Sequence, residues 1–213
     1  MPESAYARYL MLPELLRLQH PRSGSQEDDV RASENFFIVV HQSAELLAQQ
    51  TIIDLEAVVR AGEQSRCDWA GVESRLNRAL GLMEFLRHHL TVLEHLPREH
   101  FLAFRERLGT ASGHQSEQFA TIFAVLDGRD DGEPGGGVPA FVTERLAALR
   151  QAVHDWRAAH IALVRRMIGD APGTGGTAGA AWLRSRQVPA RPAQESTGPV
   201  LSVSHPGRTA AGG

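Results

Sequence analysis

The stretch "NFFIVVHQSAELLAQQ", residues 35–50, decides the fold of this chain. Five consecutive apolar residues lead directly into His41 and Gln42, and apolar residues continue beyond them at helical spacing. We therefore predict a long helix with one apolar face turned toward the core. An imidazole on such a face needs a buried partner or a ligand, so His41 is a candidate functional residue.

The composition is that of an ordinary globular domain. The chain has 213 residues, of which 42% are hydrophobic and 22% charged, and its formal net charge is −3. This charge argues against a general nucleic-acid binder, which needs a clustered basic surplus. The single cysteine, Cys67, excludes an internal disulfide and a cysteine-rich zinc site. No run approaches ~20 uninterrupted apolar residues and no leader opens the chain, so we expect a cytoplasmic protein without membrane association.

Helical periodicity runs along most of the chain, and no convincing strand pattern interrupts it. Helices are predicted over about 4–19 with an interruption at Pro13, and then over 34–61, 68–96, 97–109, 114–126 and 139–168. The fold class is therefore all-α, a helical bundle.

Two segments differ from this pattern. "DGRDDGEPGGGVP", residues 127–139, is predicted to be a flexible link, and "AAWLRS", residues 180–185, allows one further helical turn. From Gln187 onward the chain is rich in Pro, Gly, Ser and Ala and has few large apolar groups, which predicts a disordered tail. We expect one domain over residues 1–186 and a flexible C-terminal tail over 187–213.

A second histidine stands on the last long predicted helix. His160 follows Trp156 by one helical turn, and Val164 follows His160 on the same stripe. For His41 and His160 two interpretations are open. Each can be a core histidine bonded to a backbone carbonyl or a carboxylate. Alternatively, His160 ligates a metal and His41 works opposite it as a polar group in a dry pocket.

Two further motifs favour the functional interpretation. Phe101 and Arg105 lie on one face of a predicted helix, and an arginine beside aromatic rings can bind a carboxylate with two hydrogen bonds. The alternative is an ordinary surface ion pair. "APGTGGTAG", residues 171–179, is a glycine-rich turn that lets a ligand approach backbone N–H groups and the hydroxyl of Thr174. It lacks the lysine and spacing of a P-loop, so nucleotide binding is not favoured.

Together these motifs resemble the tryptophan 2,3-dioxygenase family, whose members are all-helical enzymes with a histidine-ligated haem. "YARYLMLPELLRLQ" resembles the family's N-terminal segment and "FFIVVHQSAEL" its distal-histidine helix. "FLAFRERLGTASGHQSEQF" resembles the FR…SGFQS block, and "WRAAH…MIG…GTGGTAGAAWLR" the haem-ligand helix with its glycine loop. The four blocks stand in the family's order.

The resemblance implies a role for each matching residue. His160 would ligate the iron of a haem b, and His41 would be the catalytic group that bonds the indole N–H. Arg105 would hold the substrate carboxylate, with Thr174 at the amino acid end. Residues implied to border the haem are Ser112, Gly113, Trp156 and Val164. Residues implied to contact the substrate ring are Phe37, Phe101 and Phe104, while Tyr6, Tyr9 and Leu10 would close a neighbouring subunit's site.

The function implied by the resemblance is oxygenation of the indole ring of L-tryptophan or a derivative by O2, with 2,3-dioxygenation to N-formylkynurenine as the main expectation. Two alternatives stay open. One is a haem monooxygenase of a substituted tryptophan or another aromatic amino acid in secondary metabolism, giving an oxindole or a hydroxylated product. The other is a non-catalytic haem- or amino acid-binding module. The expected partners are a tryptophan-like amino acid and O2, without nucleic acid or membrane, in a homo-oligomer (tetramer or dimer).

The chain also departs from the family pattern. The connection between the SGFQS-like block and the haem-ligand helix is shorter than in the family, and the helices after the glycine loop are largely absent. His114 stands where the family has phenylalanine, which puts a polar group near the expected pocket.

Overall fold

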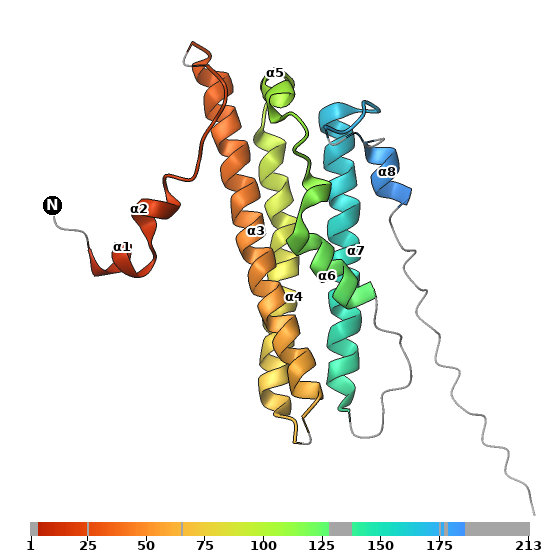
Figure 1. The fold of residues 1–213 in the computed structure, drawn as a ribbon. Helices are drawn as coiled ribbons and strands as arrows, with labels where there is room; N and C mark the ends of the chain where they lie inside the picture. Colours follow the sequence, from red (N-terminus) through yellow and green to blue (C-terminus); the bar gives the residue numbers. More distant parts are fainter. Residues whose placement is uncertain are drawn as a thin grey trace, which may run out of the picture.

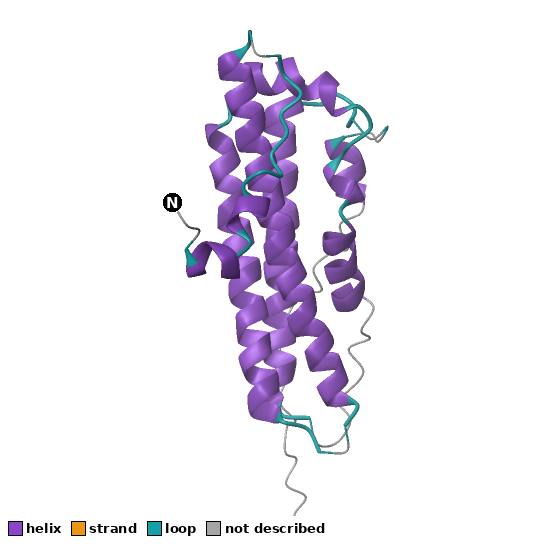
Figure 2. Ribbon diagram, turned by 60° about the vertical axis from the view of Figure 1, so that its left-hand side comes forward, coloured by secondary structure: helices purple, strands orange, loops and turns teal. Residues whose placement is uncertain are grey.

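Three long helices form the body of the molecule in the computed structural model, which describes residues 4–24, 26–64, 66–127, 138–174, 176 and 179–185 (Figure 1). They are α3 (Asp28–Gly62), α4 (Trp69–Val92) and α7 (Ala140–Ile168), and α4 packs against both of the others. The described residues form helices and loops with no strand (Figure 2). The predicted all-α bundle is therefore confirmed. None of the helices in this part of the chain is long and apolar enough to cross a membrane.

Shorter helices connect the long ones and cover one end of the bundle. α4 continues into the 3-10 turn η1 (Leu93–His95), and α5 (Arg98–Arg105) continues into η2 (Glu106–Leu108). The 3-10 turn η3 (Gly113–Gln115) precedes α6 (Glu117–Asp127), which packs on α3 and α7, and α8 (Ala180–Ser185) packs on α7. At the other end of the sequence, α1 (Ala5–Tyr9) and α2 (Leu12–Leu15) project from the side of the bundle (Figures 1 and 2).

Local signals explain most of the helix ends. Asp68 caps α4 by accepting a hydrogen bond from the backbone N–H of Gly71 at 3.1 Å. Pro139 directly precedes α7, where its fixed φ suits a helix start. Gly109 and Gly169 follow η2 and α7 with φ values of 61° and 62°, a conformation that favours glycine. The predicted ends at these positions are confirmed.

Two predicted boundaries are wrong. The first helix is interrupted at Met11, whose φ is 52°, and Pro13 lies in the first turn of α2, where its missing N–H is not needed. α3 begins at Asp28 rather than near residue 34, because Asp28 and Asp29 place negative charge at the positive end of the helix.

Other predictions lie partly outside the described residues. The predicted link begins at Asp127, the last residue of α6, and residues 128–137 are not described. The predicted tail, 187–213, also lies outside the described residues.

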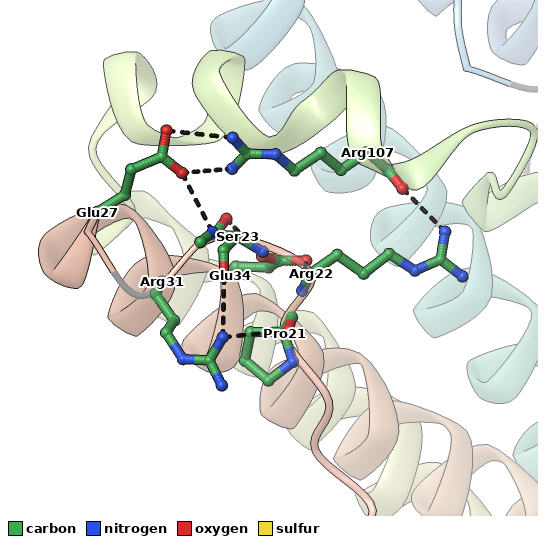
Figure 3. Close-up of polar contacts among 8 residues, drawn as sticks. Pro21, Arg22, Ser23, Glu27, Arg31, Glu34 and Arg107 are labelled. Atoms are coloured by element: carbon green, nitrogen blue, oxygen red, sulfur yellow. Dashed lines mark hydrogen bonds and ion pairs between the residues drawn. The ribbon is translucent and has the colours of Figure 1, made fainter.

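A buried carboxylate fastens the loop that leads from α2 into α3. Glu34, only 2% exposed, accepts hydrogen bonds from the backbone N–H of Arg22 at 2.9 Å and of Ser23 at 2.7 Å (Figure 3). The Ser23 hydroxyl donates to the same carboxylate at 2.6 Å. Arg107 of η2 pairs with Glu27 at 2.7 Å, and its carbonyl accepts a hydrogen bond from Arg22 at 2.9 Å. The segment that carries α1 and α2 is thereby tied to both α3 and η2.

Candidate active site

Two adjoining cavities lie between the long helices, toward the end where α4 and α7 terminate. The first, of about 210 Å³, is enclosed by α3, α4, α5 and α7, and the second, of about 580 Å³, lies against α6 and α7. The residues that line both are Gly113, His114, Phe119, Trp156, His160, Trp182 and Leu183. Both cavities therefore border His160.

His41 lines the first cavity from α3. Its Nδ1 lies 2.8 Å from the backbone carbonyl oxygen of Phe37, which can only accept, so Nδ1 carries the proton. Burial lowers the pKa of His41, the bond to Phe37 partly opposes this, and nearby His89 lowers the pKa further. The neutral ring therefore keeps Nε2 as a hydrogen-bond acceptor, and this nitrogen has no partner among the described residues.

His160 borders both cavities from α7. Its ring stacks on that of Trp156, with ring centroids 5.1 Å apart and 11° between the planes. Burial, and to a lesser extent the nearby His41, lower the pKa of His160 to about 4, so the imidazole is neutral near pH 7. Neither of its ring nitrogens has a hydrogen-bond partner among the described residues. A neutral imidazole with a free nitrogen is the form that binds a metal ion.

The surroundings of His160 fit a haem. No cluster of three or more His, Cys, Asp or Glu side chains within the described ranges could hold a metal ion. A haem iron needs only one ligand from the protein, which His160 could supply. Flat rings face the space beside His160, and those of Phe119 and Trp156 stack with centroids 4.3 Å apart. The other residues predicted to border the haem, Ser112, Gly113 and Val164, also line the first cavity.

Arg105 and Thr174 approach the first cavity from different elements. The Arg105 guanidinium, at the end of α5, donates a hydrogen bond to the carbonyl of Pro172. The Thr174 hydroxyl donates to the carbonyl of Ala111 at 2.6 Å. Both bonds hold the glycine-rich loop after α7 against the segment that follows α5. The structure thus brings Arg105 and Thr174 to one cavity, and their role in substrate binding stays a prediction.

Gly179 closes the glycine-rich loop. Its φ is 58°, and an added Cβ would lie 2.5 Å from the carbonyl oxygen of Ala171, so a larger residue would force the backbone to move. The turn directs the chain into α8, whose Trp182 and Leu183 line both cavities. The ring of Trp182 lies 5.1 Å from that of His114, so the residue that departs from the family pattern also stands in the shared wall.

Three phenylalanines were predicted around the substrate ring, and the structure separates them. Phe37 and Phe101 line the first cavity, with ring centroids 5.9 Å apart. Phe104 is fully buried behind them, 5.5 Å from Phe37 and 5.4 Å from Phe101, and is not among the lining residues. Its position supports the two wall residues from the core side.

The N-terminal candidates do not reach the cavities of their own chain. Tyr6 and Tyr9 are 69% and 86% exposed, and Leu10 is 41% exposed. They lie on or directly after α1, which stands away from the bundle core (Figure 1). Their predicted role at a neighbouring subunit's site needs a second chain and stays a prediction.

In the first cavity, two polar lining residues, Glu45 and His89, were not predicted. Glu45 accepts a hydrogen bond from the Ser116 hydroxyl at 3.0 Å. Its position one helical turn after His41 already indicates that both side chains lie on the same face of the helix. His89 lies on α4, and its Nε2 is 2.9 Å from the Ser43 hydroxyl. No motif marked His89, because only the packing of α4 on α3 brings it to the cavity.

An all-helical bundle with a free neutral imidazole beside an aromatic slot fits a histidine-ligated haem. The sequence model of the family described as tryptophan 2,3-dioxygenase matches residues 1–132 and 129–191. The chain belongs to the tryptophan 2,3-dioxygenase family and is therefore classed with haem-dependent oxidoreductases.

Individual relatives agree with this assignment. The chain is 31% identical to the tryptophan 2,3-dioxygenase of Anaeromyxobacter sp. (strain K) over 244 aligned positions, covering 84% of this chain and 89% of the relative. It is also 31% identical to the enzyme of that name from Nocardioides sp. (strain ATCC BAA-499 / JS614), covering 85% of this chain and 88% of the relative. With the protein of Herpetosiphon aurantiacus the identity is 30%, and the match covers 86% of this chain and 93% of the relative.

These relatives contain internal sequence that this chain lacks. The alignment with the Anaeromyxobacter protein spans 244 positions, which exceeds the 213 residues of the chain. The two matched parts of the family model meet at residues 129–132, between α6 and α7. The difference in length agrees with the short connection noted between the SGFQS-like block and the helix of His160.

Proposed function

We propose that this protein binds haem b through His160 and uses O2 to oxygenate the indole ring of L-tryptophan or a close derivative, with 2,3-dioxygenation to an N-formylkynurenine product as the reaction. One observation carries the proposal: His160, His41 and Arg105 line the same largely apolar cavity, two of them as neutral imidazoles. The haem, when bound, supplies an iron centre that reacts with O2. The side chains of this protein bind and orient the substrate.

His41 is suited to hold the indole N–H. Its Nδ1 proton is engaged by Phe37, so Nε2 offers a lone pair toward the cavity. Because burial keeps the ring neutral near pH 7, Nε2 stays an acceptor and does not become a donor. The ring of Phe37, 3.9 Å from that of His41 between centroids, holds the imidazole in this orientation. A single N–H···N bond then sets the direction of the indole plane.

Arg105 and Thr174 are suited to hold the amino acid end. In the structure, Arg105 donates a hydrogen bond to the neutral backbone carbonyl of Pro172, and Thr174 donates one to that of Ala111. A substrate carboxylate is a charged acceptor and forms stronger bonds with a guanidinium than a carbonyl does. It can therefore replace the carbonyl of Pro172 at Arg105. A ligand without a carboxylate cannot do so, which favours the whole amino acid over free indole.

The remaining contacts exclude water and complete the site. Phe37 and Phe101 provide flat apolar surface against the indole ring. Orientation of reactants can lower a reaction barrier by up to ~7–11 kcal/mol, and we expect this positioning to supply several kcal/mol. We further propose a homo-oligomer in which Tyr6, Tyr9 and Leu10 cover a neighbouring subunit's site. Their exposure on a projecting segment supports this arrangement.

The test is reconstitution with hemin, followed by reaction of the reduced protein with tryptophan and isotopically labelled O2. We expect a Soret band and a product that contains two labelled oxygen atoms. His160→Ala should lose the Soret band, whereas His154→Ala, on the same helix but away from the cavities, should keep it. Full haem content in His160→Ala would show that the ligand is another residue. A product with one labelled oxygen atom would show that the reaction is a monooxygenation and not a dioxygenation.

A further inference from the structure

His89 adds a polar group to an otherwise apolar part of the first cavity. It lies on α4 and lines the cavity together with the apolar residues Val40, Ala44, Leu90 and Leu93. Of these neighbours none can form a side-chain hydrogen bond. A polar side chain in such surroundings is costly unless it has a partner. One ring nitrogen of His89, Nε2, has a hydrogen-bond partner, and the other has none among the described residues.

The hydrogen bonds around Ser43 determine which ring nitrogen of His89 carries the proton. The Ser43 hydroxyl donates its only proton to the carbonyl of Val40 at 2.9 Å. The same oxygen lies 2.9 Å from Nε2 of His89, so it must accept a hydrogen bond from a protonated Nε2. Nδ1 then keeps its lone pair in the neutral ring. Burial lowers the pKa of His89, which favours this neutral form.

Two residues that line the cavity thus carry a neutral acceptor nitrogen, Nε2 of His41 and Nδ1 of His89, and neither nitrogen has a partner among the described residues. The ring system of tryptophan has a single hydrogen-bond donor, its indole N–H. A ligand that satisfies both acceptors needs a second donor on its ring. This comparison of donors and acceptors rests on the proposed function, because it assumes that the ligand is an indole amino acid.

We propose that His89 is a specificity-determining residue that accepts a hydrogen bond from a hydroxyl or amino group on the benzene ring of the substrate. The preferred ligand is then a ring-hydroxylated or ring-aminated tryptophan. Glu45 is a further acceptor at this cavity: its Oε2 accepts a hydrogen bond from Ser116 at 3.0 Å, and the Glu45→Gln variant below tests whether the carboxylate contributes to the preference. Plain tryptophan binds with Nδ1 of His89 unsatisfied or bonded to water, at a cost in affinity.

The test uses the haem-loaded, full-length protein in its ferric form and follows the Soret shift as amino acids are added, so no turnover is required. Tryptophans with a hydroxyl at each benzene-ring position in turn are compared with fluoro analogues at the same position, which have similar size and no donor. We expect the hydroxyl analogue to bind about tenfold more tightly at one ring position. His89→Leu should abolish this preference while leaving the affinity for the fluoro analogue within about threefold.

Three further variants act as controls. His89→Asn keeps an acceptor oxygen near the place of Nδ1 and should retain part of the preference. His88→Leu changes an exposed neighbour that does not line the cavity and should retain all of it. In Glu45→Gln the preference should also persist.

Four outcomes are decisive. Equal binding of hydroxyl and fluoro analogues at every position in the unmodified protein overturns the inference, even if a variant fails to fold. A preference that survives His89→Leu, or that is lost in Glu45→Gln alone, overturns the assignment to His89. A protein that binds tryptophan without any hydroxyl preference leaves the proposed function standing. A protein that loads no haem, or shows no Soret shift with any aromatic amino acid, overturns the proposed function itself and this inference with it.

Discussion

The neutral state of His160 predicts how the stability of the haem-free protein depends on pH. Its pKa is lowered from the ordinary value of 6.5 to about 4, mainly by burial. Above pH 6.5 the imidazole is neutral in both the folded and the unfolded chain and contributes nothing to pH dependence. As the pH falls below 6.5, the unfolded chain binds a proton that the folded chain excludes, so stability is lost progressively until the pH reaches about 4.

The magnitude follows from the size of the shift. One pKa unit corresponds to about 1.4 kcal/mol, so at pH 5, about 1.5 units below the unfolded pKa, His160 should reduce the free energy of unfolding by about 2 kcal/mol. The assay is urea unfolding of the haem-free protein at pH 7.5 and pH 5. The glutamine amide of His160→Gln does not titrate. Between pH 7.5 and pH 5 the free energy of unfolding of this variant should therefore fall by about 2 kcal/mol less than that of the unmodified protein.

The matched control is His154→Gln, which removes a histidine from the same helix at a position that does not line the cavities. It shows whether the loss of any histidine from this helix changes the difference between the two pH values. If His160→Gln and the unmodified protein lose the same free energy of unfolding, His160 is not held neutral by its surroundings, and the reasoning that it is a ready metal ligand fails.

Three other substitutions give distinct expectations. Arg105→Leu should weaken tryptophan binding by roughly 10–100-fold, because a charged hydrogen bond to the carboxylate is lost; equal affinity in a binding titration would exclude this role. His41→Ala should keep the Soret band and lose part of the oxygenation rate, which reconstitution followed by a product assay would measure. Glu34→Ala should lower the free energy of unfolding by about 3 kcal/mol, because donors of Arg22 and Ser23 lose their buried acceptor; a loss below about 1 kcal/mol in urea unfolding would contradict this.

Glu34 also predicts how the free energy of unfolding changes at acid pH. Burial of its carboxyl opposes ionisation, but the hydrogen bonds from Ser23 and Arg22 outweigh burial and hold the pKa below its usual value. The ionised form is therefore favoured in the folded chain. Its stabilising contribution is present above the unfolded pKa and is lost as the pH falls through the folded pKa. The Glu34→Ala protein should accordingly lose less stability on acidification than the unmodified protein.

Helix positions were predictable because their signals are local. Asp68, Pro139, Gly109 and Gly169 mark helix ends through bonds and backbone angles within one turn of the chain. The boundaries that differ from prediction also have local causes. Pro13 suits the first turn of a helix rather than a break, and the charges of Asp28 and Asp29 favour a helix start at residue 28.

Within the site, residue type and order along the chain indicated His41, His160, Arg105 and Thr174, and the structure brings all four to one cavity. What these side chains do there was decided by packing. The free nitrogen of His41 follows from the carbonyl of Phe37, and the low pKa of His160 follows from the removal of water by surrounding helices.

Periodicity and caps, which act over one or two turns, were thus enough to determine from sequence that this chain is a helical bundle with imidazoles on its apolar faces. Sequence could not determine which side chains from distant helices share a wall, because that depends on how α4 is rotated against α3. The packing of α4 on α3 brings His89 to the cavity, and the packing of α5 on α3 places Phe104 behind the cavity wall. Protonation and ligand preference depend on solvent exclusion and on contacts between helices, so only the tertiary structure decides them.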